Sequence, residues 1–215
     1  MNEKELIARR AAALLQPGWV VNLGIGIPTL VPRFVDGDTL CFQTENGLLG
    51  VGPPPEKNRV DPNCVDAGKR PVTERPGSSF FDSAASFAMI RGGHLDAVVL
   101  GALQVDEGGR VANWAIPGEP VLGVGGAMDL MSGASKVIIV MTHTTKDGVP
   151  KLVRECTLPL TSLRPVTWVV TELATFDVDA GRLSLIECAP GVSLETVQTR
   201  TAARFSDAAL TAKRT

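Results

Sequence analysis

The segment 43–53, with the sequence QTENGLLGVGP, places a carboxylate directly before a glycine-rich loop. Glu45 follows a run of residues that favour a strand, and the three glycines after it let a ligand come close to the backbone. Carboxylates are among the side chains that act as nucleophiles in covalent catalysis. Most glutamates, however, are solvated side chains in turns. The residue types alone therefore make Glu45 a candidate for chemistry and no more.

Two further glycine-rich segments are candidate ligand loops. The sequence GIGIP at 24–28 resembles part of a dinucleotide-binding fingerprint, but the third glycine is missing and Pro28 stands near its place, so the match is weak. The sequence GVGG at 123–126 offers backbone N–H groups without side chains in the way. A tight strand–helix connection would need the same glycines for positive φ angles, and both interpretations can hold together.

Other reactive residue types form no recognisable constellation. His94 and His143 are the only histidines, and neither has a cluster of possible ligands around it in the sequence, so we expect no metal site. The sequence GSSFF at 77–81 lacks the GxSxG pattern of a nucleophile elbow. The four cysteines form no CxxC pair, and reduced thiols are favoured over disulfides, which are the alternative.

The elements that must position these residues alternate between strands and helices. This alternation predicts an α/β fold, with a mainly parallel sheet and helices on both faces in three layers. Ligands bind beyond the carboxyl ends of the strands in such sheets, which is where GIGIP and Glu45 fall. We expect helices over 3–16, 29–35, 83–91 and 192–200, the last with Ser193 as N-cap, and strands over 19–23, 39–44, 95–103, 111–114, 136–141 and 167–171.

The stretch 51–78 is rich in Pro, Gly and charge, and it predicts a long irregular excursion. Loops of that length inside a compact domain are usually functional. No linker or internal repeat divides the chain. We expect one domain over residues 1–202 and a polar, loosely held tail over 203–215.

The composition is that of an ordinary globular chain, because 44% of its 215 residues are hydrophobic and 20% are charged. A net charge of -2 leaves no basic footprint, which argues against binding to nucleic acid or to an anionic membrane. The apolar runs are too short to span a bilayer, and the charged start MNEKELIARR lacks the apolar stretch of a secretory signal. We therefore expect a cytoplasmic location.

Five segments resemble the B-subunit half of the 3-oxoacid CoA-transferases, the class I family that contains succinyl-CoA:3-ketoacid and 3-oxoadipate CoA-transferases. They occur in the family's order and lie within residues 5–200. The family usually has Ser where Thr44 stands, a change that keeps the hydroxyl. The segments are VNLGIGIPTLV at 21–31, TENGLLGVGP at 44–53, GSSFFDSAASFAMIRGGH at 77–94, IPGEPVLGVGGAMDL at 116–130 and HTTKDGVPKLVRECTLPLT at 143–161.

The resemblance implies a mechanism centred on Glu45. In the family, the glutamate of the ENG motif attacks an acyl-CoA thioester and then carries coenzyme A as a covalent thioester. Gly126 is expected to supply an oxyanion donor. No cofactor would be bound permanently, because the coenzyme A thioester is itself a substrate. The residues expected to bind that substrate are Asn22, Gly24, Gly26, Asn46, Gly47, Lys69, Gly125 and Ala127, although a solvated surface lysine is the alternative for Lys69.

The resemblance also implies a partner and a reaction. The chain would work beside a homologous CoA-transferase A-subunit in a hetero-oligomer. It would move coenzyme A from a short acyl-CoA such as succinyl-CoA to a 3-oxo acid such as acetoacetate. The GSSFFDSA segment at 77–84 favours this reaction over the 3-oxoadipate branch. Rivals from other classes are a sugar-phosphate isomerase and a non-catalytic metabolite-binding subunit.

Overall fold

A single large sheet forms the centre of the molecule. In the computed structural model, which describes residues 1–35, 39–120 and 123–212 (side chains to 210), nine strands lie in the order β12-β11-β10-β8-β5-β1-β2-β3-β4. The five central strands pair in parallel, which confirms the predicted parallel sheet. They are β1 (Val20–Leu23), β2 (Cys41–Thr44), β5 (Ala97–Gly101), β8 (Lys136–Val140) and β10 (Trp168–Val170).

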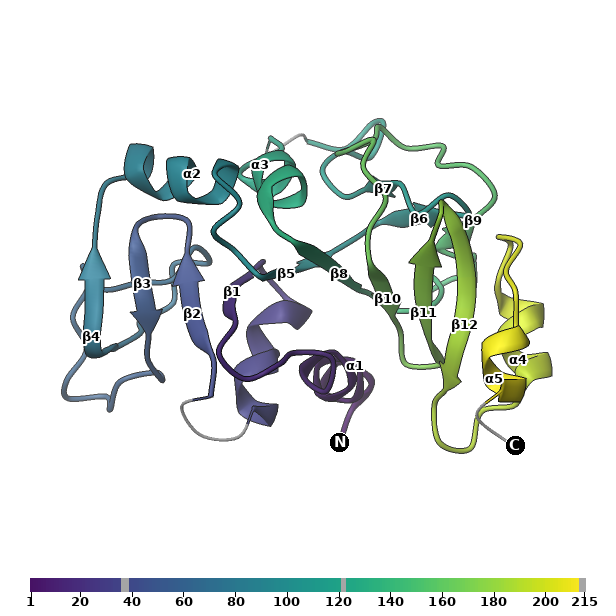
Figure 1. Cartoon of the computed structure of the whole chain (residues 1–215), viewed down its shortest axis with the longest axis horizontal. Coiled ribbons are helices and arrows are strands. Elements are labelled where there is room, and N and C mark those ends of the chain that lie inside the picture. The colour runs from purple at the N-terminus through teal and green to yellow at the C-terminus, as the bar shows by residue number, and fades with distance from the viewer. Residues whose placement is uncertain (36–38, 121–122, 213–215) are drawn as a thin grey trace.

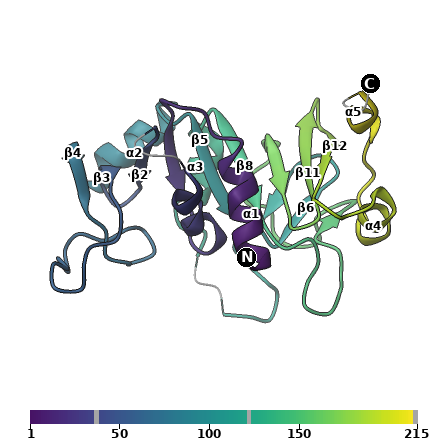
Figure 2. The same cartoon turned by 90° about the horizontal axis from the view of Figure 1, so that it is seen from below.

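Two pairs of antiparallel strands extend this sheet at its two ends, and the sequence did not predict them. One is the pair β3 (Leu48–Val51) and β4 (Glu74–Phe80), which the long segment 52–73 connects. The other is the hairpin β11 (Ala174–Asp179) and β12 (Arg182–Cys188). Figure 2 shows the strands running from β4 at one end to β12 at the other. The excursion expected over 51–78 is therefore partly strand. Its irregular part, 52–73, contains one isolated bridge between Val65 and Pro71.

Helices cover both faces of the central strands, as predicted. The residues of β5 alternate between two cores, as the period of a strand requires. Val99 packs with α1 (Glu3–Ala12) and the 3₁₀ helix η1 (Ile27–Phe34). Val98 packs instead with α2 (Ser83–Arg91) and α3 (Ala127–Gly133). Figure 1 shows α2 and α3 above these strands and α1 below them.

Local sequence explains where the helices begin and end. The N-cap predicted at Ser193 is confirmed, because its side chain accepts a hydrogen bond from the backbone N–H of Thr196 at the start of α4 (Leu194–Arg200). The helix expected over 3–16 ends earlier, at Ala12. The helix expected over 29–35 is the 3₁₀ helix η1, since Pro32 inside it removes a hydrogen bond that a longer α-helix would need.

A small second sheet lies beside the C-terminal half of the large one (Figure 1). It consists of β6 (Gln104–Asp106), β7 (Val111–Ala112) and β9 (Leu152–Val153). A turn over 107–110 joins β6 to β7. Asp106 is fully buried there and accepts hydrogen bonds from the backbone and the guanidinium of Arg110.

The expectation that the chain is loosely held from residue 203 is wrong for the residues that follow directly. Ala203 is buried in the core, and the Phe205 ring packs edge-to-face on Phe176 at 5.4 Å between centroids. The backbone of Ser206 then exchanges hydrogen bonds with β12. The last helix, α5 (Ala208–Ala212), also lies against β12. Apolar side chains at 203 and 205 therefore hold a segment whose overall composition is polar.

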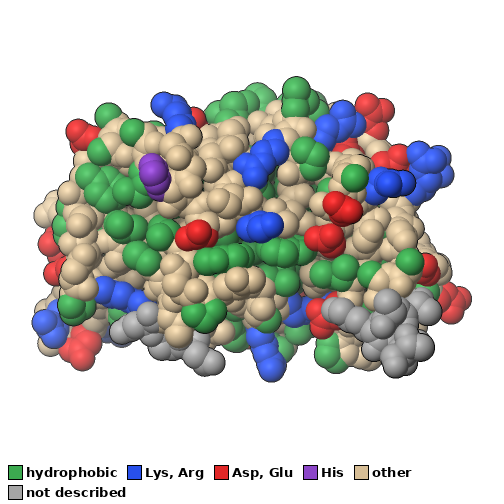
Figure 3. Space-filling model, in the orientation of Figure 1, with side chains coloured by type: hydrophobic (Ala, Val, Ile, Leu, Met, Phe, Trp, Pro, Cys, Tyr) green, Lys and Arg blue, Asp and Glu red, His purple; other side chains and the backbone are tan. Residues whose placement is uncertain are grey.

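The molecular surface carries charges of both signs. On the face shown in Figure 3, Lys and Arg side chains are interspersed with Asp and Glu. None of the helices in the described ranges combines the length and apolar character that crossing a bilayer requires.

Buried His143 gives the fold a pH dependence. Its ring nitrogens lie 2.9 Å from the hydroxyls of Thr171 and Thr201, and burial, together with the charge of Arg200, lowers the pKa of His143 to about 4. In the unfolded chain this histidine binds its proton near pH 6.5. The contribution of neutral His143 to the free energy of unfolding is therefore fully present above that pH and is lost as the pH falls towards 4. We expect a loss of about 3 kcal/mol over this window.

Chemical unfolding at a series of pH values checks this prediction. His143→Gln should lose less stability between pH 6.5 and 4 than the wild type, because it has no group that titrates there. The matched control is His94→Gln, which changes the exposed histidine and should follow the wild-type curve. Equal pH slopes for His143→Gln and the wild type would contradict the assignment.

Candidate functional site

Glu45 stands where β2 ends and the turn to β3 begins. The backbone N–H of Gly47 donates to the carbonyl of Thr44 at 3.0 Å and closes this turn. The Glu45 side chain is half-buried. Asn22, which is fully buried on the neighbouring strand β1, donates from Nδ2 to Oε2 of Glu45 at 3.2 Å. The structure therefore brings the predicted nucleophile and one predicted binding residue into direct contact.

The 123–126 loop brings backbone to the same carboxylate. A Cβ placed on Gly126 would lie 3.7 Å from Cγ of Glu45 and 3.2 Å from Cζ of Phe87. Gly126 is also the N-cap of α3, whose first residue is Ala127. Gly125 has a φ of 57°, in the region that favours glycine. Glycine at 126 therefore leaves room for backbone and a ligand beside Glu45.

Gly47 has a structural reason to be glycine. Its φ is 120°, and a Cβ there would run into the carbonyl oxygen of Phe81. The carbonyl of Gly47 accepts a hydrogen bond from the N–H of Phe81 at 3.0 Å. This close approach ties the turn after Glu45 to the segment that leads into α2.

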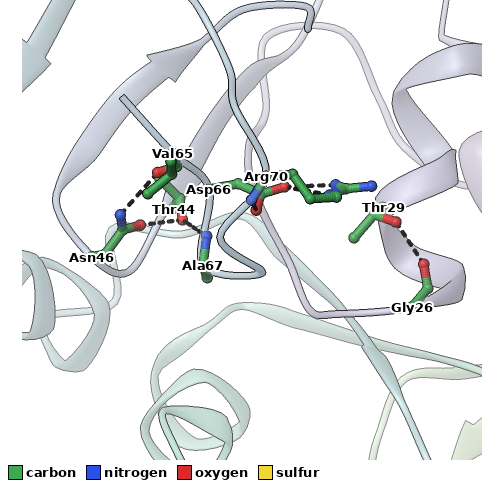
Figure 4. Close-up of polar contacts among 8 residues, drawn as sticks. All are labelled: Gly26, Thr29, Thr44, Asn46, Val65, Asp66, Ala67 and Arg70. Atoms are coloured by element: carbon green, nitrogen blue, oxygen red, sulfur yellow. Dashed lines mark hydrogen bonds and ion pairs between the residues drawn. The ribbon is translucent and has the colours of Figure 1, made fainter. Parts of the chain in front are cut away.

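Thr44 and Asn46 fasten the long loop to the Glu45 turn, as Figure 4 shows. The Thr44 hydroxyl donates to Oδ1 of Asn46 at 2.6 Å and accepts from the backbone N–H of Ala67 at 2.9 Å. Nδ2 of Asn46 donates to the carbonyl of Val65 at 2.9 Å. Both bonds of Thr44 need a hydroxyl, which explains how Thr can replace Ser here. Asn46 thus has a structural contact in addition to its predicted binding role.

Lys69 lies in the turn that the hydrogen bonds of Thr44 and Asn46 hold in place. Its backbone N–H donates to the carbonyl of Asp66, and its φ of 60° is left-handed. The Asp66 carboxylate accepts two hydrogen bonds from the Arg70 guanidinium, at 2.9 and 2.6 Å (Figure 4). The Lys69 side chain itself is exposed. The turn is therefore fixed near the site, while the ammonium group is free to meet a ligand.

The GIGIP loop adjoins this turn. A Cβ placed on Gly68 would lie 3.8 Å from Cγ1 of Ile25. Gly26 has a φ of 91°, and its carbonyl accepts from the Thr29 hydroxyl at 2.7 Å. A Cβ on Gly24 would lie 2.9 Å from a methyl carbon of Leu100. Gly24 is therefore needed for packing against β5, and Gly26 for the turn into η1.

A cavity of about 650 Å³ lies between η1, the β1–β3 strands and the loop 52–75. Its walls are mostly apolar and include the charged residues Arg33, Lys57, Asp66, Arg70 and Arg75. Of the described residues, neither Glu45 nor Gly126 is part of its lining. We therefore place the candidate site at the Glu45 carboxylate and not in this cavity. Among the described residues, no group of three or more His, Cys, Asp or Glu side chains is arranged to hold a metal ion.

Comparison with known proteins shows the family to which this chain belongs. Residues 4–200 match the model of the coenzyme A transferase family. The chain belongs to that family. It is 51% identical to the beta subunit of the acetate CoA-transferase of Escherichia coli, over 97% of this chain and 96% of that protein. It is 49% identical to the B-subunit of the succinyl-CoA:3-ketoacid coenzyme A transferase of Helicobacter pylori, over 94% of this chain and 98% of that protein.

Solved structures of coenzyme A transferases share the fold. The acyl-CoA transferase YdiF of E. coli O157:H7, as apoenzyme, superposes with a TM-score of 0.75 at 25% identity. The match covers 96% of this chain and 43% of YdiF, so the chain spans less than half of that enzyme. A second YdiF structure, described as a thioester complex with CoA, superposes with a TM-score of 0.69 at 26% identity.

Three residues at or next to the site were not predicted from the sequence. Phe87 lies beside Gly126, and Gln43 accepts a hydrogen bond from Asn22. Ser86 in turn contacts Gln43. One signal was visible, because Gln43 interrupts the strand-forming run LCFQT with a polar side chain. The partners of Gln43 were not visible, since they lie in other elements.

Proposed function

We propose that this coenzyme A transferase uses Glu45 as its nucleophile, with Gly126 as an oxyanion donor. The observation that supports the proposal most strongly is the meeting of three distant segments at one carboxylate. Glu45 is half-buried, contacts the buried amide of Asn22, and lies beside backbone that carries no side chain at Gly126. A carboxylate in that setting is held in one orientation and partly shielded from water.

The proposed exchange needs no metal and no net proton transfer. A Glu45 oxygen attacks the thioester carbonyl, a C–O bond forms, the C–S bond breaks, and the coenzyme A thiolate leaves a mixed anhydride. The thiolate attacks the glutamyl carbonyl of that anhydride, which gives an enzyme thioester and the free donor acid. The acceptor carboxylate then repeats both steps in reverse and leaves as its own acyl-CoA. Each step passes through an oxyanion that a backbone N–H can stabilise.

For the substrates, we propose a short acyl-CoA, succinyl-CoA first, and a 3-oxo acid such as acetoacetate. The H. pylori relative, whose name states succinyl-CoA and a 3-ketoacid, supports this choice. Acetate is a second candidate acceptor, because the E. coli relative named for acetate is equally similar. Membership of the transferase family argues against the sugar-phosphate isomerase, while 3-oxoadipate remains an alternative acceptor.

We also propose a homologous A-subunit as partner. Two relatives that match almost end to end are named as a beta subunit and a B-subunit. YdiF, in contrast, is more than twice as long as the segment that this chain matches. A second chain of similar size would supply what the longer enzyme carries in one chain.

The test is an exchange assay on the complex formed by this chain and its genomic neighbour. Succinyl-CoA, acetyl-CoA and acetoacetyl-CoA serve as donors, and acetoacetate, acetate, succinate and 3-oxoadipate as acceptors. The expected result is ping-pong exchange with the highest specificity constant for succinyl-CoA and acetoacetate. Preference for acetate would select the second candidate, and a complex that binds coenzyme A without exchange would favour a non-catalytic subunit.

Lys69 is expected to bind the coenzyme A part of the substrate. In Lys69→Asn the lost charge-assisted contact should lower kcat/KM for acyl-CoA by about 10- to 150-fold, while KM for the free acid is unchanged. Asn is chosen because it tolerates the left-handed φ of 60° at this position. Steady-state kinetics measures the effect, with Lys146→Asn, at another exposed lysine, as control. An unchanged kcat/KM for acyl-CoA would make Lys69 an ordinary surface residue.

A further inference from the structure

A line of buried polar side chains runs from α2 to Glu45. Nε2 of Gln43 donates to the hydroxyl of Ser86 at 2.9 Å. Nδ2 of Asn22 donates to Oε1 of Gln43 at 2.6 Å and also to Oε2 of Glu45 at 3.2 Å. Ser86 and Asn22 are 0% exposed and Gln43 is 2% exposed, so water does not compete with these bonds.

This line replaces apolar residues that the fold would otherwise use. Asn22 is in register with Val98 on one side and with Gln43 on the other, and Val98 is in register with Val137. The row of side chains beneath α2 and α3 thus changes from valine to amide as it approaches Glu45. Buried amides cost stability unless they are hydrogen-bonded, and apolar residues of similar shape would serve packing as well. The two amides therefore point to a role beyond packing.

The Glu45 carboxylate determines which atom donates and which accepts in each hydrogen bond of this line. A carboxylate only accepts, so the Asn22 amide must turn its nitrogen towards Glu45. The same nitrogen then faces Gln43, which must present its oxygen to Asn22 and its nitrogen to Ser86. Turning the Gln43 amide over would place two donors against each other. Gln43 therefore locks the Asn22 amide in place.

The unpaired atom of Asn22 supports this interpretation. Oδ1 of Asn22 is buried and has no hydrogen-bond partner among the described residues. Leaving a buried acceptor unpaired is destabilising, so the orientation of this amide is not the one that its own hydrogen bonding alone would favour. The contacts with Gln43 and Glu45 hold it there.

We propose that Gln43, anchored by Ser86, is a positioning residue of the transferase reaction. It fixes the Asn22 amide, which holds Oε2 of Glu45 and leaves Oε1 as the attacking oxygen. The inference rests on the proposed role of Glu45 as nucleophile. Gln43 does not touch the reacting atoms, so its loss affects the rate of attack more than the binding of acyl-CoA.

The test measures single-turnover formation of the enzyme thioester in the complex with the partner chain. Gln43→Met keeps the length of the side chain and removes the amide. The rate should fall about 10- to 100-fold, as misplacement of a reacting group by about an ångström does. The KM for acyl-CoA should change less than about threefold. Ser86→Ala should lower the rate in the same direction but less.

A double-mutant cycle separates positioning from general damage. Gln43→Met combined with Ser86→Ala should be no slower than Gln43→Met alone, because both changes break the same line. The matched control is Thr175→Val on β11, which removes a buried hydrogen bond that the Thr175 hydroxyl accepts from Arg10 of α1. It should lower the unfolding free energy and leave the rate unchanged.

Three results would overturn the inference: a folded Gln43→Met complex that keeps the wild-type rate, losses that multiply in the double variant, or an equal loss in Thr175→Val. If Gln43→Met does not fold, a folded Ser86→Ala complex with the wild-type rate has the same effect. A wild-type complex without any exchange would contradict the proposed function instead. An active wild type that is indifferent to Gln43 leaves that function standing.

Discussion

Replacing Glu45 by glutamine is expected to lower the exchange rate by about ten-thousandfold or more, which is the scale of removing a covalent nucleophile. The amide has nearly the shape of the carboxylate, so the contact with Asn22 can persist through the amide oxygen. It is a far weaker nucleophile, and no anhydride can form from it. Substrate binding should therefore survive while chemistry stops, and the thermal unfolding temperature should stay close to that of the wild type.

Two comparisons make the Glu45 result specific. Glu74→Gln changes an exposed carboxylate on β4, in the same half of the sheet, and should retain full activity. Glu45→Asp keeps the charge but withdraws it by one methylene, so it should retain a small part of the activity. Moving a reacting group by about one ångström can lower the reaction rate by about a hundredfold.

A covalent adduct should accompany activity. Wild-type complex incubated with acyl-CoA alone should carry coenzyme A on the peptide that contains Glu45, as mass spectrometry would show. Hydroxylamine or borohydride should remove the adduct and inactivate the enzyme. Glu45→Gln should carry no adduct. Normal turnover by that variant, or an adduct on another residue, would be incompatible with the proposed nucleophile.

The central sheet could be predicted because its strands carry a strong local signal. The run from Ala97 to Leu100 is apolar at every position, which is typical of a strand buried on both faces, and the structure places it at the middle of the sheet. The outer antiparallel strands carry a weaker signal. Strand β4 has the sequence ERPGSSF, whose Pro76 and Gly77 indicate a loop. Pairing with β3 overrides that local preference, and sequence patterns do not show pairing.

The candidate site, like the fold, has a part that the sequence predicts and a part that only the structure shows. Glu45 and the glycine loops could be singled out by residue type and by resemblance. The structure adds why particular residues stand there: Gly47 avoids the carbonyl of Phe81, and the Thr44 hydroxyl holds the backbone of Ala67. Such contacts join segments far apart in the chain, so no local pattern reports them. Gln43 is the clearest case, because its meaning depends on Asn22.

The purified chain without a partner is expected to be folded and nearly inactive. Losing one oxyanion donor lowers rates by about a hundred- to a thousandfold, and an open site would lose shielding from water as well. We therefore expect less than about a thousandth of the activity of the complex. Addition of the homologous partner should restore it. Native mass spectrometry confirms which chains each sample contains.

We expect the proposed partner to cover the site at the exposed apolar side chains around it. Ile25 is 69% exposed in the GIGIP loop, and Met128 is 42% exposed in the first turn of α3. The GIGIP loop follows β1, whose Asn22 contacts Glu45, and α3 begins after Gly126, which lies beside Glu45. Apolar side chains at such positions are typical of a surface that another chain buries. An obligate complex should bury more than the roughly 1,600 Å² of a standard interface.

Charged substitutions on this surface test the arrangement. Ile25→Glu and Met128→Glu should weaken association and thereby abolish the restored activity, because each would bury an unpaired carboxylate. Val149→Glu, at an apolar residue that is 57% exposed in the turn 145–149, should leave association unchanged. Excess partner should rescue the first two variants in part, which distinguishes weak association from damaged chemistry. Full ping-pong exchange by this chain alone, as a homo-oligomer, would show that no second type of chain is needed.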